Sequence, residues 1–204
     1  KKDAVDVVLA VVGLDERSES EGLDRSTMAI PQVQNDLVTA LAKTGKPVVI
    51  VLVAGSPVEL PWINDVAAML YVGLSGQAGA SATVRALTGE VNPSGHLAET
   101  WPMQYEDCPS SGWYPAIGRD AIYREGPFVG YRYYETVGVP VRFPFGYGLS
   151  YSTFTYSAIT ATATGAHIAH GDEVLEIRSA NGLPILPQSF RLSDFSGLWH
   201  ALPD

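Results

Sequence analysis

Three short apolar runs, each the length of a buried strand, alternate with segments of helical pattern in the first half of the chain. Between Pro31 and Gly45 the apolar side chains repeat at helical spacing, and an Ala- and Gly-rich helix is expected over 76–87. Strand–helix–strand alternation is typical of parallel pairing. The sequence therefore predicts an α/β fold with a mostly parallel sheet flanked by helices and strands over 5–12, 47–54 and 68–72.

An acidic loop follows the first predicted strand. The strand over 5–12 is β-branched and almost wholly apolar, so we expect it to be buried on both faces and near the centre of the sheet. Ligands of open α/β sheets bind at the carboxyl ends of the strands, where this loop begins. Glu16, Glu19 and Glu21 lie close together in it, and neighbouring like charges favour the protonated form that a general acid needs. A solvated loop without chemistry is the alternative reading.

Charge and composition exclude several classes of function. The chain of 204 residues carries 13 basic and 22 acidic side chains, a net charge of −9, which argues against nucleic acid and anionic lipid as partners. One cysteine, Cys108, excludes an internal disulfide and a zinc site built on several thiolates. No apolar run reaches the length of a membrane span.

The start of the chain has neither a Met nor the pattern of a signal peptide. We therefore expect a segment of a longer, soluble protein, either cytoplasmic or secreted.

Other candidate sites carry weaker signals. His167 and His170 are spaced so that they could share a metal ion, but two histidines alone are poor evidence. Ser56, Ser75 and Ser94 lack the context of a nucleophile elbow. The aromatic residues around 113–134 suit either stacking on sugar rings or packing in the core.

Several ordered motifs between residues 4 and 157 together resemble glycoside hydrolase family 3, most closely its β-glucosidases and β-xylosidases. The motifs are ESEGLDR (19–25), VNPSGHL (91–97) with TWP (100–102), YREG (123–126) with VGYRYY (129–134), and FPFGYGLSY (143–151). Gly13-Leu14 and Gln34 accompany the first of them, ESEGLDR.

The resemblance implies a fold and a mechanism. Residues 1–154 would form the family's C-terminal (α/β)6-sandwich domain. Residues 155–204 would form a short β-rich or irregular tail, which is either a partial start of a fibronectin-III-like domain or an irregular segment. In the family an Asp on a (β/α)8 barrel attacks the anomeric carbon, and a Glu on the sandwich is the general acid/base of retaining hydrolysis. Glu21 matches that Glu, Glu19 is the second choice, and Glu125 a weaker third that we expect to be structural. No metal or organic cofactor is implied.

The chain departs from the family pattern in lacking the barrel and its nucleophile. We therefore expect the acid/base-carrying domain of an exo-acting β-glycosidase, inactive without a barrel in the same or a partner chain. Its substrates would be terminal β-glucosides or β-xylosides. One alternative is a non-catalytic carbohydrate-binding or scaffold domain that docks on a barrel. Another is an unrelated flavodoxin-like domain, against which the motifs after residue 89 argue.

Overall fold

A computed structural model describes residues 5–114, 119–120 and 122–153, together with short strands at 160–163, 174–178 and 190–191. The chain divides into two compact units, Lys1–Ser152 and Thr153–Asp204. The first unit holds all of the motifs noted above.

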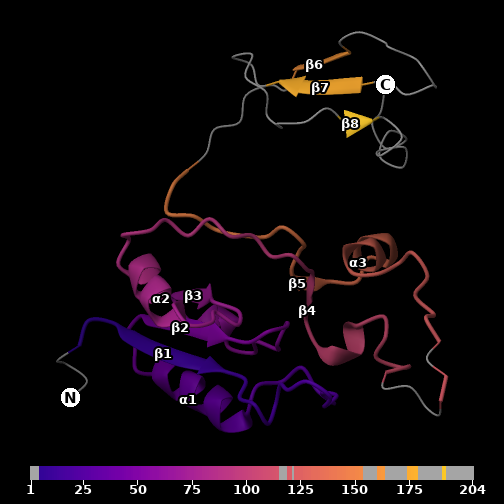
Figure 1. Cartoon of the computed structure of the whole chain (residues 1–204). Coiled ribbons are helices and arrows are strands. Elements are labelled where there is room, and N and C mark those ends of the chain that lie inside the picture. Colours follow the sequence, from indigo (N-terminus) through magenta and orange to yellow (C-terminus); the bar gives the residue numbers. More distant parts are fainter. Residues whose placement is uncertain are drawn as a thin grey trace. The chain divides into compact units, whose positions relative to one another are not determined.

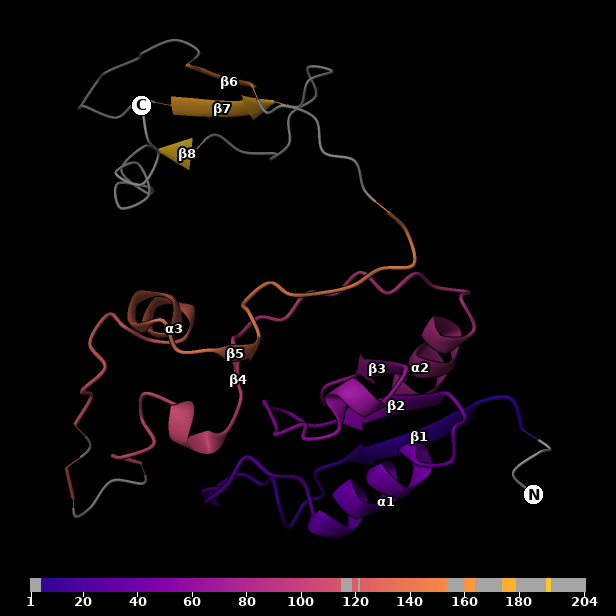
Figure 2. The same ribbon diagram turned by 180° about the vertical axis from the view of Figure 1, so that it is seen from behind.

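A parallel three-stranded sheet forms the centre of the first unit, as predicted. Its strands are β1 (Val8–Gly13), β2 (Val48–Val53) and β3 (Ala68–Tyr71), in the spatial order β1-β2-β3. Helix α1 (Gln32–Ala42) lies beside β1, and α2 (Gly79–Leu87) lies beside β3 (Figures 1 and 2). The α/β class and the two helices are therefore confirmed.

One face of the sheet packs on α1 and on the chain after β2. Alternate residues of β2 point to this face, and all of them are buried, as expected for a central strand. Val38 of α1 and Trp62, which comes just before the short helix η2 (Ile63–Asp65), pack with these residues in the hydrophobic core. The largest fully buried side chains are Trp62, Trp101, Ile50, Leu52, Leu60, Val38, Val48 and Val58.

The prediction that the first strand is buried on both faces near the centre of the sheet is wrong. In the part of the chain that the structure describes, β1 is an edge strand. Ala10 and Val12 face the core, whereas Leu9 and Val11 are 54% and 66% exposed on the other face. A run of aliphatic residues predicts a strand, but it does not distinguish a central strand from an edge strand whose second face is uncovered.

Gly13, the last residue of β1, lies against Val53, the last residue of β2. A Cβ added there would stand 1.8 Å from the carbonyl oxygen of Val53, so only glycine fits without a backbone shift. We predict that Gly13→Ala lowers the free energy of unfolding by about 1–3 kcal/mol, as overpacking does. Urea unfolding of the chain measures it, and Gly112→Ala, at an exposed position with open space for a Cβ, is the control. Equal midpoints for the two variants would contradict this account.

The motifs at 91–102 and 143–151 come together around a short antiparallel pair, β4 (Trp101–Pro102) with β5 (Val141–Phe143). The buried ring of Trp101 contacts Tyr71 and Phe143, with ring centroids 5.1 and 5.8 Å apart. The Asn92 side chain bonds the Ser150 hydroxyl and accepts from the amide of Tyr151 at 2.9 Å. Two of the motifs are thus joined through Asn92.

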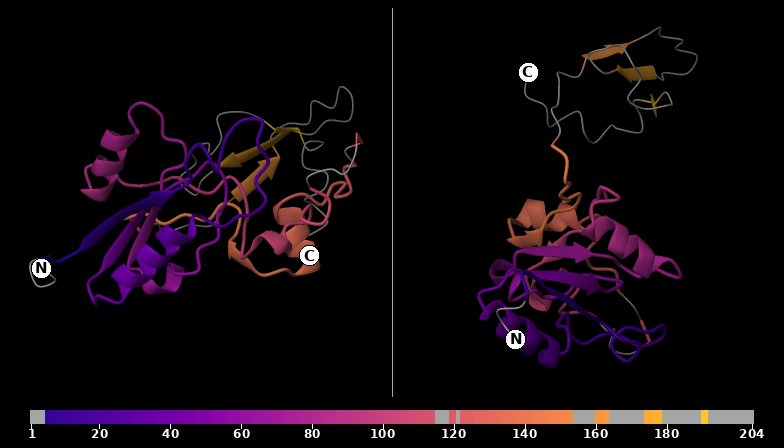
Figure 3. Two further views of the ribbon diagram at one scale, coloured as in Figure 1. Left: turned by 90° about the horizontal axis from the view of Figure 1, so that it is seen from below. Right: turned by 90° about the vertical axis from the view of Figure 1, so that its left-hand side faces the viewer.

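Two short helices complete the first unit. They are η3 (Tyr105–Asp107) and α3 (Tyr131–Val137), which ends at Gly138 in the left-handed conformation. The carboxyl ends of β1 and β2 point toward the side of the unit where α3 lies (Figures 1 and 3).

In the second unit the described segments form an antiparallel sheet of β6 (Thr160–Ala163), β7 (Val174–Arg178) and β8 (Phe190–Arg191). The strand expected at 174–178 is present.

Across the described residues of the chain, none of the helices has the length and apolar character that crossing a bilayer requires.

Candidate active site

The acidic loop, residues 14–25, leaves the carboxyl end of β1, as the sequence predicts. Its first residues are fixed to the sheet. The amide of Leu14 donates to Val53 O at 2.9 Å, and the side chain of Gln34 bonds both the amide and the carbonyl of Gly13. The carboxylate of Asp15 then accepts from the hydroxyl of Ser18 at 2.8 Å and from its amide at 3.0 Å. The loop therefore starts from a defined direction.

The bonds to Asp15 also favour its ionised form. The hydrogen bond from the Ser18 hydroxyl is the largest of the effects that lower the pKa of Asp15 below its usual range. A carboxyl group that stays ionised in this way is a poor proton donor near neutral pH. The bonds of Asp15 with Ser18 hold the turn at the start of the loop.

Glu21 occupies a tight turn at the tip of the loop. The amide of Leu23 donates to Ser20 O at 3.3 Å, and Gly22 has a φ of +77°, which glycine adopts without strain. Glu21 precedes Gly22 in the turn, and it is exposed. Among the residues that the structure describes, its carboxylate has no hydrogen-bond or ionic partner.

Glu19, the second choice from the sequence, is held at the end of β2. One carboxylate oxygen accepts from the amide of Gly55 at 2.8 Å, and the other accepts from the hydroxyl of Ser56 at 3.2 Å. Arg25 donates from Nη1 to the same hydroxyl at 2.7 Å. The two carboxylates therefore differ in situation, since Glu19 is half-buried and bonded while Glu21 is exposed at the tip.

Tyr114 contacts the same loop. The Tyr114 hydroxyl donates a short hydrogen bond to Asp24, and this bond is the main reason that the pKa of Tyr114 is raised. Tyr105 in turn donates its hydroxyl to the carbonyl of Tyr114 at 3.2 Å. These contacts connect η3 to the part of the loop that follows Glu21.

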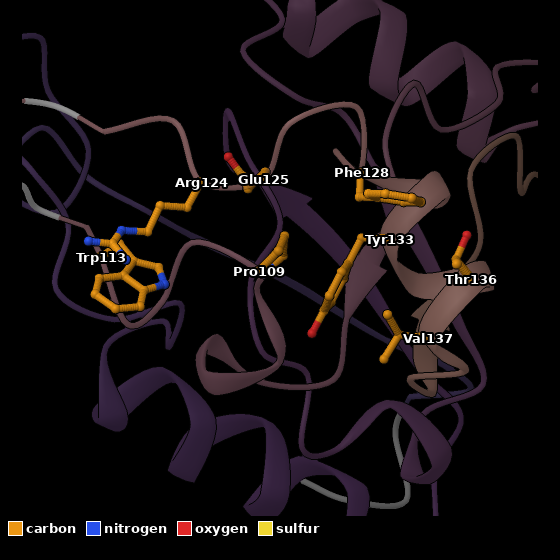
Figure 4. A pocket seen from close by; sticks show the side chains of 8 residues that line it. All are labelled: Pro109, Trp113, Arg124, Glu125, Phe128, Tyr133, Thr136 and Val137. Carbon is orange, nitrogen blue, oxygen red and sulfur yellow. The ribbon is translucent and has the colours of Figure 1, made fainter.

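Glu125 lies elsewhere, in a pocket of about 340 Å³ beside α3. The guanidinium of Arg124 stacks 3.8 Å from the ring centre of Trp113, and Glu125 is half-buried next to it (Figure 4). None of the acidic-loop residues lines this pocket, whose lining is Pro109, Trp113, Arg124, Glu125, Phe128, Tyr133, Thr136 and Val137. The structure therefore does not bring Glu125 together with Glu19 and Glu21.

Comparison with known proteins identifies the family. The model of the glycosyl hydrolase family 3 C-terminal domain matches residues 1–151. The chain belongs to glycoside hydrolase family 3. It is 49% identical over 155 residues to the thermostable beta-glucosidase B of Acetivibrio thermocellus, a match that covers 76% of this chain and 20% of that relative.

Two further matches extend the family assignment. An exo-alpha-(1->6)-L-arabinopyranosidase of Bifidobacterium breve is 43% identical over 165 residues, which cover 80% of this chain and 22% of that protein. The crystal structure of a family 3 beta-glucosidase of Bifidobacterium adolescentis superposes with a TM-score of 0.77 at 41% identity, over 87% of this chain and 27% of that one. The chain spans about a fifth of the length of the curated relatives it matches.

The remaining candidates from the sequence have other surroundings. Cys108 is half-buried beside Met28, and burial is the main cause that raises the pKa of its thiol, which keeps it neutral near pH 7. His167 and His170 lie outside the described residues. Within those residues no group of three or more His, Cys, Asp or Glu side chains could hold a metal ion. The sequence did not reveal that Gly55 and Ser56, in the Gly-Ser-Pro turn after a buried strand, bond to the acidic loop; Ser56 was considered there only as a nucleophile.

Proposed function

We propose that this domain carries the general acid/base of a retaining, exo-acting β-glycosidase, and that Glu21 is that residue. The observation that supports the proposal is the exposed Glu21 carboxylate at the tip of a loop whose flanks are bonded to the sheet. A group that transfers protons to a sugar oxygen must be accessible and held in place, and Glu21 meets both conditions. The relatives called beta-glucosidases indicate a terminal β-linked sugar as substrate.

The mechanism needs a second carboxylate, which we propose lies on a (β/α)8 barrel. In the first step that carboxylate attacks the anomeric carbon, while the Glu21 carboxyl donates its proton to the departing oxygen. In the second step the Glu21 carboxylate takes a proton from water, which attacks the glycosyl-enzyme and restores the starting configuration. The two carboxyl groups would stand about 5–5.5 Å apart.

We also propose domain limits. Residues 1–154 form the sandwich domain, and residues 155–204 form part of a fibronectin-III-like domain rather than an irregular tail. The antiparallel arrangement of β6, β7 and β8 supports the second assignment, because such domains consist of antiparallel sheets.

The proposal is tested by assaying the purified chain on aryl β-glucoside and β-xyloside while its mass in solution is recorded. We predict no turnover by the chain alone. We predict turnover by a chimera in which residues 1–151 replace the matched segment of the Acetivibrio thermocellus relative. Clear turnover by the chain alone, lost in Glu21→Gln, would contradict the need for a barrel. An inactive, folded chimera would support a domain without a catalytic role.

A further inference from the structure

The acidic loop is tied to the end of β2 on both sides of Glu21, and both ties meet at one hydroxyl group. Ser56 donates to Oε1 of Glu19 at 3.2 Å, and it accepts from Nη1 of Arg25 at 2.7 Å. Glu19 and Arg25 lie on either side of the turn that carries Glu21. We propose that Ser56 is a positioning residue, which clamps the two ends of this turn and so fixes where the Glu21 carboxylate stands. The catalytic part of this proposal rests on the function proposed above.

A hydroxyl group is suited to this place because it donates one hydrogen bond and accepts others. The guanidinium of Arg25 only donates hydrogen bonds, and an ionised Glu19 only accepts them. The hydroxyl of Ser56 can therefore link the two, because it accepts from Arg25 and donates to Glu19. Hydrogen bonds to charged groups are stronger than neutral ones. Alanine cannot form either bond, whereas threonine keeps both.

The residue before Ser56 strengthens the clamp. The amide of Gly55 donates to the second oxygen of Glu19 at 2.8 Å, so the carboxylate is held at both oxygens. A Cβ at position 55 would stand 2.9 Å from Oε1 of Glu19 and 3.1 Å from Cδ1 of Leu74. A side chain at position 55 would therefore push the Glu19 carboxylate away from this backbone.

On the Arg25 side of the turn, the clamp rests on a single hydrogen bond among the described residues. Arg25 is half-buried, and its Nη2 is buried without a hydrogen-bond partner among the described residues. Its bond to Ser56 is the one hydrogen bond that its guanidinium makes with those residues. Removing the hydroxyl would leave the cation without that partner, and it would leave Glu19 held by the amide of Gly55 alone, so the loop would gain freedom.

The clamp is tested first on the intact chain by amide hydrogen exchange. We expect Ser56→Ala to speed exchange of the amides of Gly55 and Leu23 at least about fivefold, as the loss of one net hydrogen bond predicts. Ser56→Thr is expected to restore the slow exchange. Ser26→Ala removes an exposed hydroxyl that has no hydrogen-bond partner among the described residues, and it is expected to change nothing. Unchanged exchange in Ser56→Ala would overturn the clamp.

The positioning role is tested in the chimera with aryl β-glucosides of graded leaving-group acidity. We expect Ser56→Ala to lower kcat/KM about tenfold or more for poor leaving groups and far less for good ones, with recovery in Ser56→Thr. A uniform loss would overturn the positioning role, because mere destabilisation affects all substrates alike. If Glu21→Gln showed no dependence on the leaving group, the proposed function would fail, while the exchange data would still report on the clamp.

Discussion

Glu21→Gln in the chimera is expected to lower kcat/KM for phenyl and alkyl β-glucosides by about 10²–10⁴-fold, the usual contribution of general acid catalysis. An amide cannot donate a proton to the departing oxygen, so a poor leaving group must depart as an anion. A dinitrophenyl leaving group departs without such help, and its kcat/KM is expected to change by less than about tenfold. Initial rates over the series measure the effect.

The control is Glu16→Gln, which removes an exposed carboxylate from the same loop. Glu16 has no hydrogen-bond partner for its side chain among the described residues, so we expect wild-type rates for every substrate. A Glu21→Gln enzyme as active as Glu16→Gln would show that the acid lies elsewhere. Glu19→Gln would then be the next variant to assay.

Trp62→Ala is expected to lower the free energy of unfolding by about 3–5 kcal/mol, the cost of truncating a large aromatic side chain in a core. Trp62 is 1% exposed and packs within the cluster that joins β2 and α1. Its indole nitrogen donates to Oδ1 of Asn35 at 2.8 Å, and Asn35 is itself buried. The variant therefore leaves a cavity and removes the partner of a buried amide. Urea unfolding followed by circular dichroism measures the change.

Trp113→Ala is the matched control because it makes the same substitution at a ring that is 56% exposed. Its stacking on Arg124 contributes about 0.5–1 kcal/mol at such a site, so we expect a small loss of stability. Similar losses in the two variants would contradict the place given to Trp62 in the core.

The elements of the first half of the chain were predictable because their signals are local. The strand at 47–54, the helix between Pro31 and Gly45, and the loop that carries Glu21 follow from apolar spacing and turn residues. The edge position of β1 depends on which strands pair, and this is a property of the whole fold. Helix α3 was missed because its sequence, Tyr131–Val137, is rich in aromatic residues that do not favour a helix strongly.

The candidate site was predictable only in part. The acidic loop was visible because carboxylates cluster after a strand, and the family motif distinguished Glu21 from its neighbours. The anchoring of Glu19 and Arg25 was not visible, because Ser56 lies in a separate turn that only the pairing of β1 with β2 brings near. A serine after a buried strand has no signal of its own, and its role depends on which side chains it meets.

The measurement that tests the central claim most directly is azide rescue of Glu21→Ala in the chimera with dinitrophenyl β-glucoside as substrate. Removing the carboxylate deprives the second step of its base, so the glycosyl-enzyme should accumulate. Azide is a small anion that needs no base, and we predict that it raises kcat and yields β-glucosyl azide of retained configuration. No rescue in Glu21→Ala, with rescue in Glu19→Ala, would contradict the assignment of Glu21 as the acid/base.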